Sequence, residues 1–458
     1  MSHKSTFECN YYDNLYGQIN LPPIAFDFLN QCPELQRLRD IGLMNFKSFH
    51  LLGLSNISRL EHALGIVHLC QVFSSVNKLD KDQKNHLIVA ALYHDVNCAP
   101  FGHSIEWALN RYSEFDHELR SDWILSPSSL DELDKRPVYF DPPGLWKSKL
   151  LQKYGINIDV IKNLIQGTKT HFFINNAGVD LDNIDNVFRM AKALGIDDAG
   201  KKATGLIKAL RFKEKHSNFV IRKKDINFIE EWYRLRTSIY RFFIYSDEYM
   251  AYEFLLFRLA DKLAEIFGKK EIEKLWFETD QGLLSTLRGI DKVKPIVRRL
   301  MKGELYYVIS IIRISDSNKR IYKSLNDVSR VLKIRDEIKA VLNKNELNWT
   351  NKILGDCFIH VTTDFRKTNR KIEFIVEDGL YIEPQNIGDD RNFTLISILS
   401  KKIPTNKETA IINDTASKIL SQIFRSKIVF VPINRLRDKA KNKIALPIQK
   451  SLFGSNDG

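Results

Sequence analysis

An adjacent histidine and aspartate end an apolar stretch in the first quarter of the chain. The stretch HLIVAALYHDV closes on His94 and Asp95. If the stretch is helical, the two Cβ directions differ by about 100°, so both side chains can reach one ion at the helix end. The pair alone is weak evidence, because most His-Asp dipeptides in proteins bind no metal.

Two further segments offer ligands of the same kind. The upstream segment RLEH contains Arg59 and His62, and the downstream segment VDLDNIDNVFR contains three aspartates, Asp180, Asp182 and Asp185. One more histidine and one distant aspartate would complete four ligands of mixed nitrogen and oxygen type. Such a set suits a divalent Mn, Mg, Fe or similar ion that keeps open positions for water. The three segments together therefore predict a metal site.

Four segments together resemble the landmarks of the HD-domain deoxynucleoside triphosphate triphosphohydrolases: RLEHALGI, YHDVNCAPFGH, DHE and GVDLDNIDNVFR. That family includes the bacterial dGTP triphosphohydrolases and the mammalian SAM-and-HD-domain dNTP hydrolase. The segments LYGQINLPPIAFDFLNQCPELQRLRDIG and KPIVRRLMKGELYYVI resemble its opening segment and a later helix, so the similarity spans residues 11 to 310. It implies a hydrolase that cleaves a dNTP into a deoxynucleoside and triphosphate.

The resemblance also implies which residues bind the metal. It places the ligands at four positions: His62, His94, Asp95 and Asp182. Asp180 and Asp185 remain alternatives to Asp182, because a shift of register in VDLDNID would exchange them. The implied cofactor is a divalent metal ion, and the implied substrate is a nucleotide.

The remaining site residues are also implied by the resemblance. His103 matches the family's catalytic histidine, with Glu106 three residues later as its orienting carboxylate, and His117 matches a second histidine that assists proton transfer. Arg59 and Arg236 match arginines that contact substrate phosphate, for which the planar guanidinium is suited. The alternatives are ordinary surface or core histidines and solvated helix faces.

The chain departs from the family at the nucleotide clamp. Cys98 stands where the family has a histidine, and we interpret it as a small buried side chain rather than a nucleophile. Asn183 and Asn186 replace a lysine and a tyrosine, Met190 replaces an aspartate near the sugar, and Leu43 replaces a glutamine. We therefore expect weaker preference for deoxyribose than the family shows.

Three other functions remain open at the level of sequence. A nuclease or nucleotide phosphatase could use the same metal site, and a non-catalytic nucleotide sensor or nucleic-acid-binding scaffold could keep the fold without turnover. A di-iron HD oxygenase would need extra histidine ligands. The formal net charge of +13 favours an anionic partner such as a nucleotide or a nucleic acid, without choosing between them.

Hydrophobic periodicity predicts a mainly α fold, with an HD-type helical domain over residues 1–345 and a C-terminal α+β lobe over residues 346–458. Helical spacing runs through residues 33–264 and 272–342, interrupted by loops at 126–144 and 197–205. In the lobe, β-branched segments predict strands at 357–363, 371–376 and 427–431, and a helix at 408–424.

Composition indicates the compartment. The five cysteines are scattered and show no CxxC spacing, which argues against a disulfide framework and a zinc ribbon. No segment approaches ~18 uninterrupted apolar residues, so we expect no contact with the membrane and a cytoplasmic protein. The family resemblance further implies a homo-oligomer.

Overall fold

The structure is a computed structural model and confirms a mainly helical chain. It describes residues 9–102, 104–106, 145–167, 174, 179–212, 219–315, 333–334, 336–337, 340, 357–361, 374–376, 381–382, 393–425 and 428–433. The chain divides into two compact units built from interleaved segments. Unit 1 comprises Met1–Leu235, Leu259–Lys294 and Lys371–Gln385, and unit 2 comprises Arg236–Arg258, Pro295–Arg370 and Asn386–Gly458. These units are interleaved along the chain, so they do not test the predicted domain boundary at residue 345, which stays a prediction.

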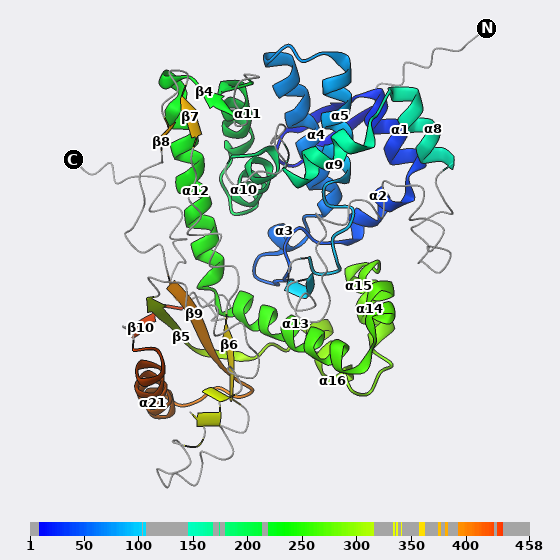
Figure 1. Cartoon of the computed structure of the whole chain (residues 1–458). Coiled ribbons are helices and arrows are strands. Elements are labelled where there is room, and N and C mark those ends of the chain that lie inside the picture. Colours follow the sequence, from blue (N-terminus) through cyan, green and yellow to red (C-terminus); the bar gives the residue numbers. More distant parts are fainter. Residues whose placement is uncertain are drawn as a thin grey trace. The chain divides into compact units, whose positions relative to one another are not determined.

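Unit 1 begins with an antiparallel hairpin and continues as packed helices (Figure 1). Its elements up to the sheet of short strands are β1 (Cys9–Asp13), β2 (Gly17–Leu21), α1 (Pro23–Gln31), α2 (Pro33–Arg37), the 3-10 turn Leu38–Asp40, α3 (Leu52–Ser55), α4 (Arg59–Val76), α5 (Lys81–Tyr93), α8 (Leu145–Tyr154), α9 (Ile158–Gln166), α10 (Leu181–Ala193) and α11 (Ala199–Ala209).

The remaining elements of unit 1 include a small mixed sheet of order β3-β4-β7-β8, in which β4 and β7 are parallel. They are β3 (Leu210–Arg211), β4 (Val220–Ile221), the 3-10 turn Lys223–Asp225, α14 (Lys269–Trp276), α15 (Asp280–Leu287), β7 (Phe374–Val376) and β8 (Tyr381–Ile382). The helices α12 (Ile226–Ile244) and α13 (Asp247–Ile266) are divided between the two units.

Helix starts in the core of unit 1 follow from local capping. The Ser58 hydroxyl accepts the Glu61 N–H and begins α4, and Asp80 with Gln83 forms a reciprocal capping box at α5. Most residues of α4 and the C-terminal half of α5 are buried, and α4 packs against α5, α10 and α11. The helices that carry the predicted ligands therefore form the interior of this unit.

The predicted loop at residues 197–205 is wrong, because most of it lies in α11. Two glycines gave the segment its loop-like composition, yet both are needed for close packing. A side chain at Gly200 would overlap the Leu15 carbonyl of the hairpin loop, and one at Gly205 would lie 2.9 Å from the Phe228 ring. Glycine here permits contact between elements rather than a turn. The predicted loop at 126–144 lies outside the described residues.

Unit 2 contains a four-stranded antiparallel sheet of order β10-β5-β9-β6 (Figure 1). Its elements are α16 (Lys294–Lys302), whose first residue belongs to unit 1, and β5 (Tyr307–Ser315), β6 (Cys357–Val361), β9 (Phe393–Ser400), α21 (Asn406–Phe424) and β10 (Ile428–Val431). The helical spacing predicted through 272–342 is wrong at β5, a central strand. Most residues of β5 are buried on both faces, so the alternation that identifies a half-buried strand is missing.

Both faces of this sheet are covered by helices of unit 2. On one face, isoleucines of β5 and β9 pack against α21. On the other face, His360 of β6 lies 2.8 Å from Glu253 of α13 through Nε2 and Oε2, and Phe254 contacts Phe358 with ring centroids 5.3 Å apart. The alternate residues Ile359 and Val361 pack on the side of α21, so residues one step apart on β6 face different helices, as the pleat requires.

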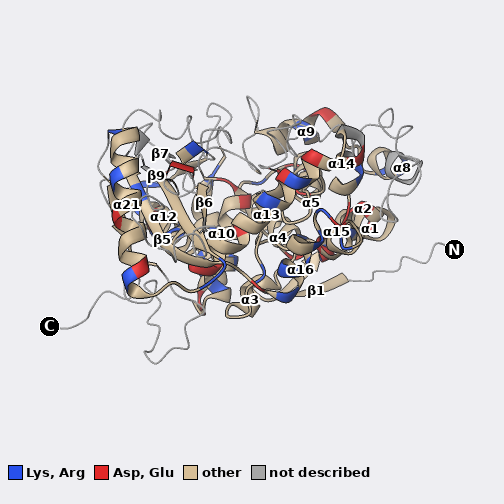
Figure 2. Ribbon diagram, turned by 90° about the horizontal axis from the view of Figure 1, so that it is seen from below, with Lys and Arg blue, Asp and Glu red and all other residues tan. Residues whose placement is uncertain are grey.

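The strands and the helix predicted after residue 346 are present within the described residues, as β6, β7, β10 and α21. However, β7 pairs with β4 and belongs to unit 1. Among the described helices, α21 carries both basic and acidic side chains (Figure 2). None of the described helices is long and apolar enough to cross a membrane.

Candidate metal centre

Helix α4 brings Arg59 and His62 into the interior near its N-terminus. Ser58 caps the helix, so Arg59 is the first helical residue and His62 lies one turn further on. Both side chains are almost fully buried, at 3% and 1% exposure. A buried polar group is costly unless it is hydrogen-bonded, so each must have partners within the unit.

His94 lies at the C-terminal end of α5, and its ring is fixed by the backbone. Nδ1 lies 2.8 Å from the Ala91 carbonyl, which can only accept, so Nδ1 must carry the hydrogen. In the neutral ring Nε2 is then a lone-pair donor. Among the residues that the structure describes, this buried Nε2 finds no hydrogen-bond partner. An orphaned imidazole nitrogen held in this way is suited to a metal ion.

The three aspartates at the start of α10 face three different partners. The Asp180 carboxylate caps the helix by accepting the Asn183 N–H at 2.6 Å. Asp182 Oδ1 lies 2.8 Å from His62 Nε2, and Asp185 Oδ2 lies 2.6 Å from His62 Nδ1. The geometry thus favours Asp182 among the three as a ligand, since it faces the same nitrogen of His62 that lies toward His94.

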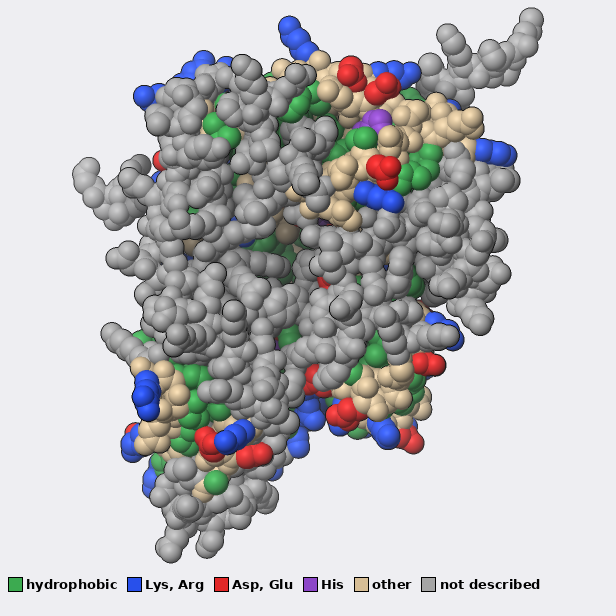
Figure 3. All heavy atoms as spheres, viewed as in Figure 1, with side chains coloured by type: hydrophobic (Ala, Val, Ile, Leu, Met, Phe, Trp, Pro, Cys, Tyr) green, Lys and Arg blue, Asp and Glu red, His purple; other side chains and the backbone are tan. Residues whose placement is uncertain are grey.

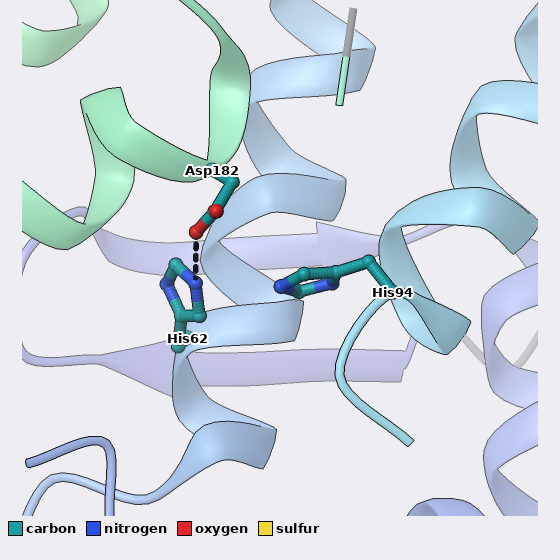
Figure 4. A group of neighbouring side chains, drawn as sticks. All are labelled: His62, His94 and Asp182. Carbon is teal, nitrogen blue, oxygen red and sulfur yellow. Dashed lines mark hydrogen bonds and ion pairs between the residues drawn. The ribbon is translucent and has the colours of Figure 1, made fainter. Parts of the chain in front are cut away.

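His62, His94 and Asp182 converge on one point from α4, α5 and α10 (Figure 4). One ligand atom from each lies within 4.8 Å of the other two, as expected of residues that can share an ion. Neighbouring ligands of an octahedral ion with bonds of about 2.1 Å are roughly 3 Å apart, close to the 2.8 Å between His62 and Asp182. This donor set fits a divalent cation with open coordination positions.

The charges around His62 and Asp182 act on the pKa values of both groups. Burial lowers the pKa of an imidazole, but the hydrogen bonds and charges of Asp182 and Asp185 outweigh this and raise the pKa of His62 to about 9. Likewise, burial raises the pKa of a carboxyl, but His62 outweighs it and lowers that of Asp182. A cation that binds His62 through Nε2 would therefore compete with a proton for that nitrogen.

Asp95 lies beside this group and is held by Arg59. Asp95 Oδ2 is 3.4 Å from His94 Nε2 and 2.5 Å from Arg59 Nη1, while Cys98 Sγ donates to its Oδ1 at 3.3 Å. Burial opposes the charge of Arg59, but Asp95 outweighs it and keeps the pKa of Arg59 above its ordinary value. Asp95 is therefore placed at the edge of the centre with its charge balanced by an arginine.

The loop after His94 is fixed by buried backbone contacts. Arg37, which is fully buried, donates to the Val96 carbonyl at 3.1 Å, the Cys98 carbonyl at 2.8 Å and the Phe277 carbonyl at 2.9 Å. Burial lowers the pKa of Arg37 to about 10, which still leaves it charged at neutral pH. Carbonyl groups that would otherwise be buried without a donor are satisfied in this way.

A tight turn follows, at which Phe101 and Gly102 both have positive φ, 57° and 52°. The Phe101 N–H donates to Asp280 Oδ1 at 2.7 Å, and the other oxygen of Asp280 accepts the Gly42 N–H at 3.0 Å. Glycine is required at 102, because a side chain there would lie 2.6 Å from Arg59 Nη2. The turn thus approaches the arginine that holds Asp95.

The predicted catalytic residues are only partly within the described structure. His103 and His117 lie outside the described residues. Glu106 is buried, and its backbone N–H bonds to the Gly102 carbonyl at 3.2 Å. Arg236 belongs to unit 2, where it is buried with its guanidinium 4.9 Å from the Tyr240 ring centroid. The roles given to these residues stay predictions.

The departures from the family pattern have structural roles of their own. The Asn183 amide donates to both oxygens of Asp180 at 2.8 Å and so strengthens the helix cap. Met190 and Leu43 are buried, at 1% and 8% exposure. Cys98 is fully buried, as expected for a small side chain in the interior.

Sequence reasoning missed a group of residues behind His62. Arg189 lies on α10 one turn after Asp185 and binds it, and it also reaches Asp13 and Glu61. The spacing of Asp185 and Arg189 is that of a helical ion pair, which the sequence offered as a signal. No local pattern marks Asp13, because it comes from a hairpin far away in sequence.

In comparisons with known proteins, neither any protein-family model nor any curated protein matches this chain.

Proposed function

We propose that this protein is a divalent-metal-dependent phosphohydrolase of the HD type that acts on nucleotides, most typically on dNTPs to release triphosphate. The observation that carries the proposal is the convergence of two buried histidines, His62 and His94, with the partly exposed Asp182 at the ends of three helices. Groups with this donor set and open positions are typical of metal-assisted hydrolysis. The segment resemblance supplies the substrate class.

A bound divalent cation would polarise a phosphoryl oxygen and lower the pKa of a coordinated water. The protein residues prepare the place for it. Asp185 accepts from Nδ1 of His62, and the Ala91 carbonyl accepts from Nδ1 of His94, so both rings present Nε2 to the same point. Fixed rings lose little freedom on coordination, which favours binding.

Arg59 supports the phosphate part of the proposal. It is buried beside the centre and bound to Asp95 through Nη1, while its Nε has no hydrogen-bond partner among the described residues. The guanidinium therefore keeps donor capacity that a phosphate oxygen could use. At the same time it holds Asp95 in place.

The altered clamp residues support a change in sugar preference. Met190 offers no hydrogen bond to a sugar hydroxyl, Leu43 offers none either, and the Asn183 amide is engaged by Asp180. A site rejects an analogue most strongly when its own polar groups would be left unpaired. We therefore expect only a weak preference for dNTPs over NTPs, with rates for the two within about tenfold.

Two histidines and one carboxylate are also the ligand set of non-haem iron(II) oxygenases. The pairing of Asp95 with Arg59 favours this second candidate, because an Asp95 bound to the arginine leaves three metal ligands, His62, His94 and Asp182.

A nuclease would need a basic surface along which the nucleic-acid strand could bind. On one face, basic and acidic side chains are interspersed over the described surface rather than gathered by sign (Figure 3).

The test is product analysis on the full-length protein after metal removal. Portions reloaded with Mn²⁺, Mg²⁺ or Fe²⁺ are incubated with dNTPs, NTPs, dNMPs and single-stranded DNA, and products are resolved by chromatography while oxygen uptake is recorded. We expect Mn²⁺- or Mg²⁺-dependent cleavage of nucleoside triphosphates, with triphosphate as the leaving product and dNTP and NTP rates within about tenfold.

Other outcomes reject the proposal in distinct ways. Release of orthophosphate from dNMPs, or cleavage of DNA alone, would replace it by a phosphatase or a nuclease. Oxygen uptake with Fe²⁺ and no hydrolysis would identify the oxygenase. Metal binding with no turnover of any substrate would favour the nucleotide sensor.

A further inference from the structure

Arg189 is a buried cation at the junction of three elements of unit 1. Its Nε and Nη2 donate to the two oxygens of Asp185 at 2.8 and 3.0 Å, and its Nη1 lies 2.9 Å from both Asp13 and Glu61. These partners come from α10 itself, from β1 and from α4. Two parallel hydrogen bonds to one carboxylate fix the plane of both groups.

The carboxylate that Arg189 fixes is the one that binds His62. Asp185 Oδ2 accepts from Arg189 Nε and lies 2.6 Å from His62 Nδ1. Because both oxygens of Asp185 accept hydrogen bonds from Arg189, the carboxylate faces His62 as an acceptor of the Nδ1 hydrogen. It holds the hydrogen on Nδ1 and leaves Nε2 for coordination.

The hairpin completes the chain of contacts. Asp13 accepts the Leu15 and Tyr16 N–H groups through Oδ1, at 2.7 and 2.9 Å, and contacts Arg189 through Oδ2. Asp13 is 1% exposed, and its side chain touches none of the three grouped ligands in these contacts. One carboxylate therefore shapes the hairpin turn and holds the arginine.

The ion pair of Asp185 and Arg189 packs closely against the backbone of α4 at Gly65. A side chain at Gly65 would overlap both Asp185 and Arg189. A helix interior ordinarily disfavours glycine by roughly 0.5–1 kcal/mol relative to alanine. The glycine is accommodated because the ion pair lies directly against the helix backbone.

We propose that Arg189 is a positioning residue for the metal centre. It connects the hairpin carboxylate Asp13 to Asp185, and Asp185 in turn sets the orientation of His62. This inference rests on the proposed function, because it assigns His62 to a metal. Loss of a group hydrogen-bonded to a metal ligand typically weakens metal affinity by about 10- to 100-fold. A change one contact further away should have a smaller effect of the same sign.

Two variants test the chain of contacts. Arg189→Lys keeps the charge but cannot form the paired contact with Asp185 while reaching Asp13. Asp13→Asn keeps an oxygen for the Leu15 and Tyr16 N–H groups but turns an amide donor toward Arg189. The matched control is Asp27→Asn, which removes a different carboxylate of unit 1 from its contacts with Lys153 and Tyr154.

The measurement is the Kd for Mn²⁺ by calorimetry on the full-length proteins, with unfolding midpoints taken with and without Mn²⁺. We expect about 3- to 10-fold weaker binding for Arg189→Lys, which acts one contact beyond Asp185, about 2- to 3-fold for Asp13→Asn, and no change for Asp27→Asn. The visible spectrum of the Co²⁺-loaded proteins should change in the first two variants, because ligand geometry sets that absorption.

The outcomes separate this proposal from the proposed function. If wild type binds Mn²⁺ and both variants bind it equally well, Arg189 is merely structural and the positioning role is overturned, while a metal enzyme remains. A lower unfolding midpoint with unchanged Mn²⁺ affinity overturns the positioning role in the same way. If wild type binds no divalent cation, both proposals fail.

Discussion

Three aspartates within six residues perform three tasks because the helix start fixes their directions. With Asp180 at the N-cap, Asp182 and Asp185 are three residues apart within α10 and fall on nearby sides. One meets each nitrogen of His62. The sequence identified the aspartates but did not assign their roles, since a shift of one residue in the helix start rotates every side chain by about 100°.

The assignment predicts a sharp contrast between neighbouring substitutions. Asp182→Asn should abolish measurable Mn²⁺ binding, because a neutral amide replaces the anionic ligand of a buried cation. Asp180→Asn should bind Mn²⁺ with an affinity within about threefold of wild type, since asparagine caps a helix about as well as aspartate. Calorimetric Mn²⁺ titration of both proteins, with circular dichroism as the folding control, measures the contrast. If Asp180→Asn loses the metal and Asp182→Asn keeps it, the register is wrong.

At the scale of elements, the sequence foresaw the helices that carry the centre. Apolar periodicity predicted the helical run that contains α4 and α5, and the His-Asp pair falls where α5 ends. It did not foresee β5, whose buried run YVISIIRIS lacks alternation. It also missed α11, because Gly200 and Gly205 resemble turn residues when the partners they pack against are unknown. Long-range packing, which decides both cases, has no local signature.

Packing of α4 against the ion pair yields a prediction about Gly65. Gly65→Ala should destabilise the protein by about 1–3 kcal/mol, although alanine favours a helix, because the added methyl overlaps Asp185 and Arg189. Gly53→Ala in α3 is the control, since a methyl there meets only the Ala193 carbonyl at 3.8 Å. Urea unfolding of both variants measures the difference. Equal stability of Gly65→Ala and wild type would mean that the ion pair does not lie against this helix.

For the whole molecule, composition favoured an anionic partner and little more. The net charge of +13 raises the local concentration of phosphates but does not locate a site. The candidate metal centre instead depends on chain segments far apart in sequence, from β1 to α10, all within unit 1. The net charge therefore gives no information about where the grouped ligands lie, and only the ligands constrain the chemistry.

This distribution predicts where a metal ion stabilises the molecule. The three grouped ligands and the contacts of Arg189 all lie in unit 1. A ligand at 100 times its Kd stabilises the native state by about 2.7 kcal/mol, so amides that exchange through opening of that unit should slow by roughly 100-fold. Hydrogen exchange followed by mass spectrometry, with and without Mn²⁺, should show slower exchange in α4, in α10 and in the hairpin β1–β2.

The same comparison should leave exchange in β5, β9 and α21 unchanged, because they supply none of these three ligands. Equal slowing in α21 and α4 would contradict a metal centre confined to unit 1, and slowing in α4 without the hairpin would remove the link through Asp13.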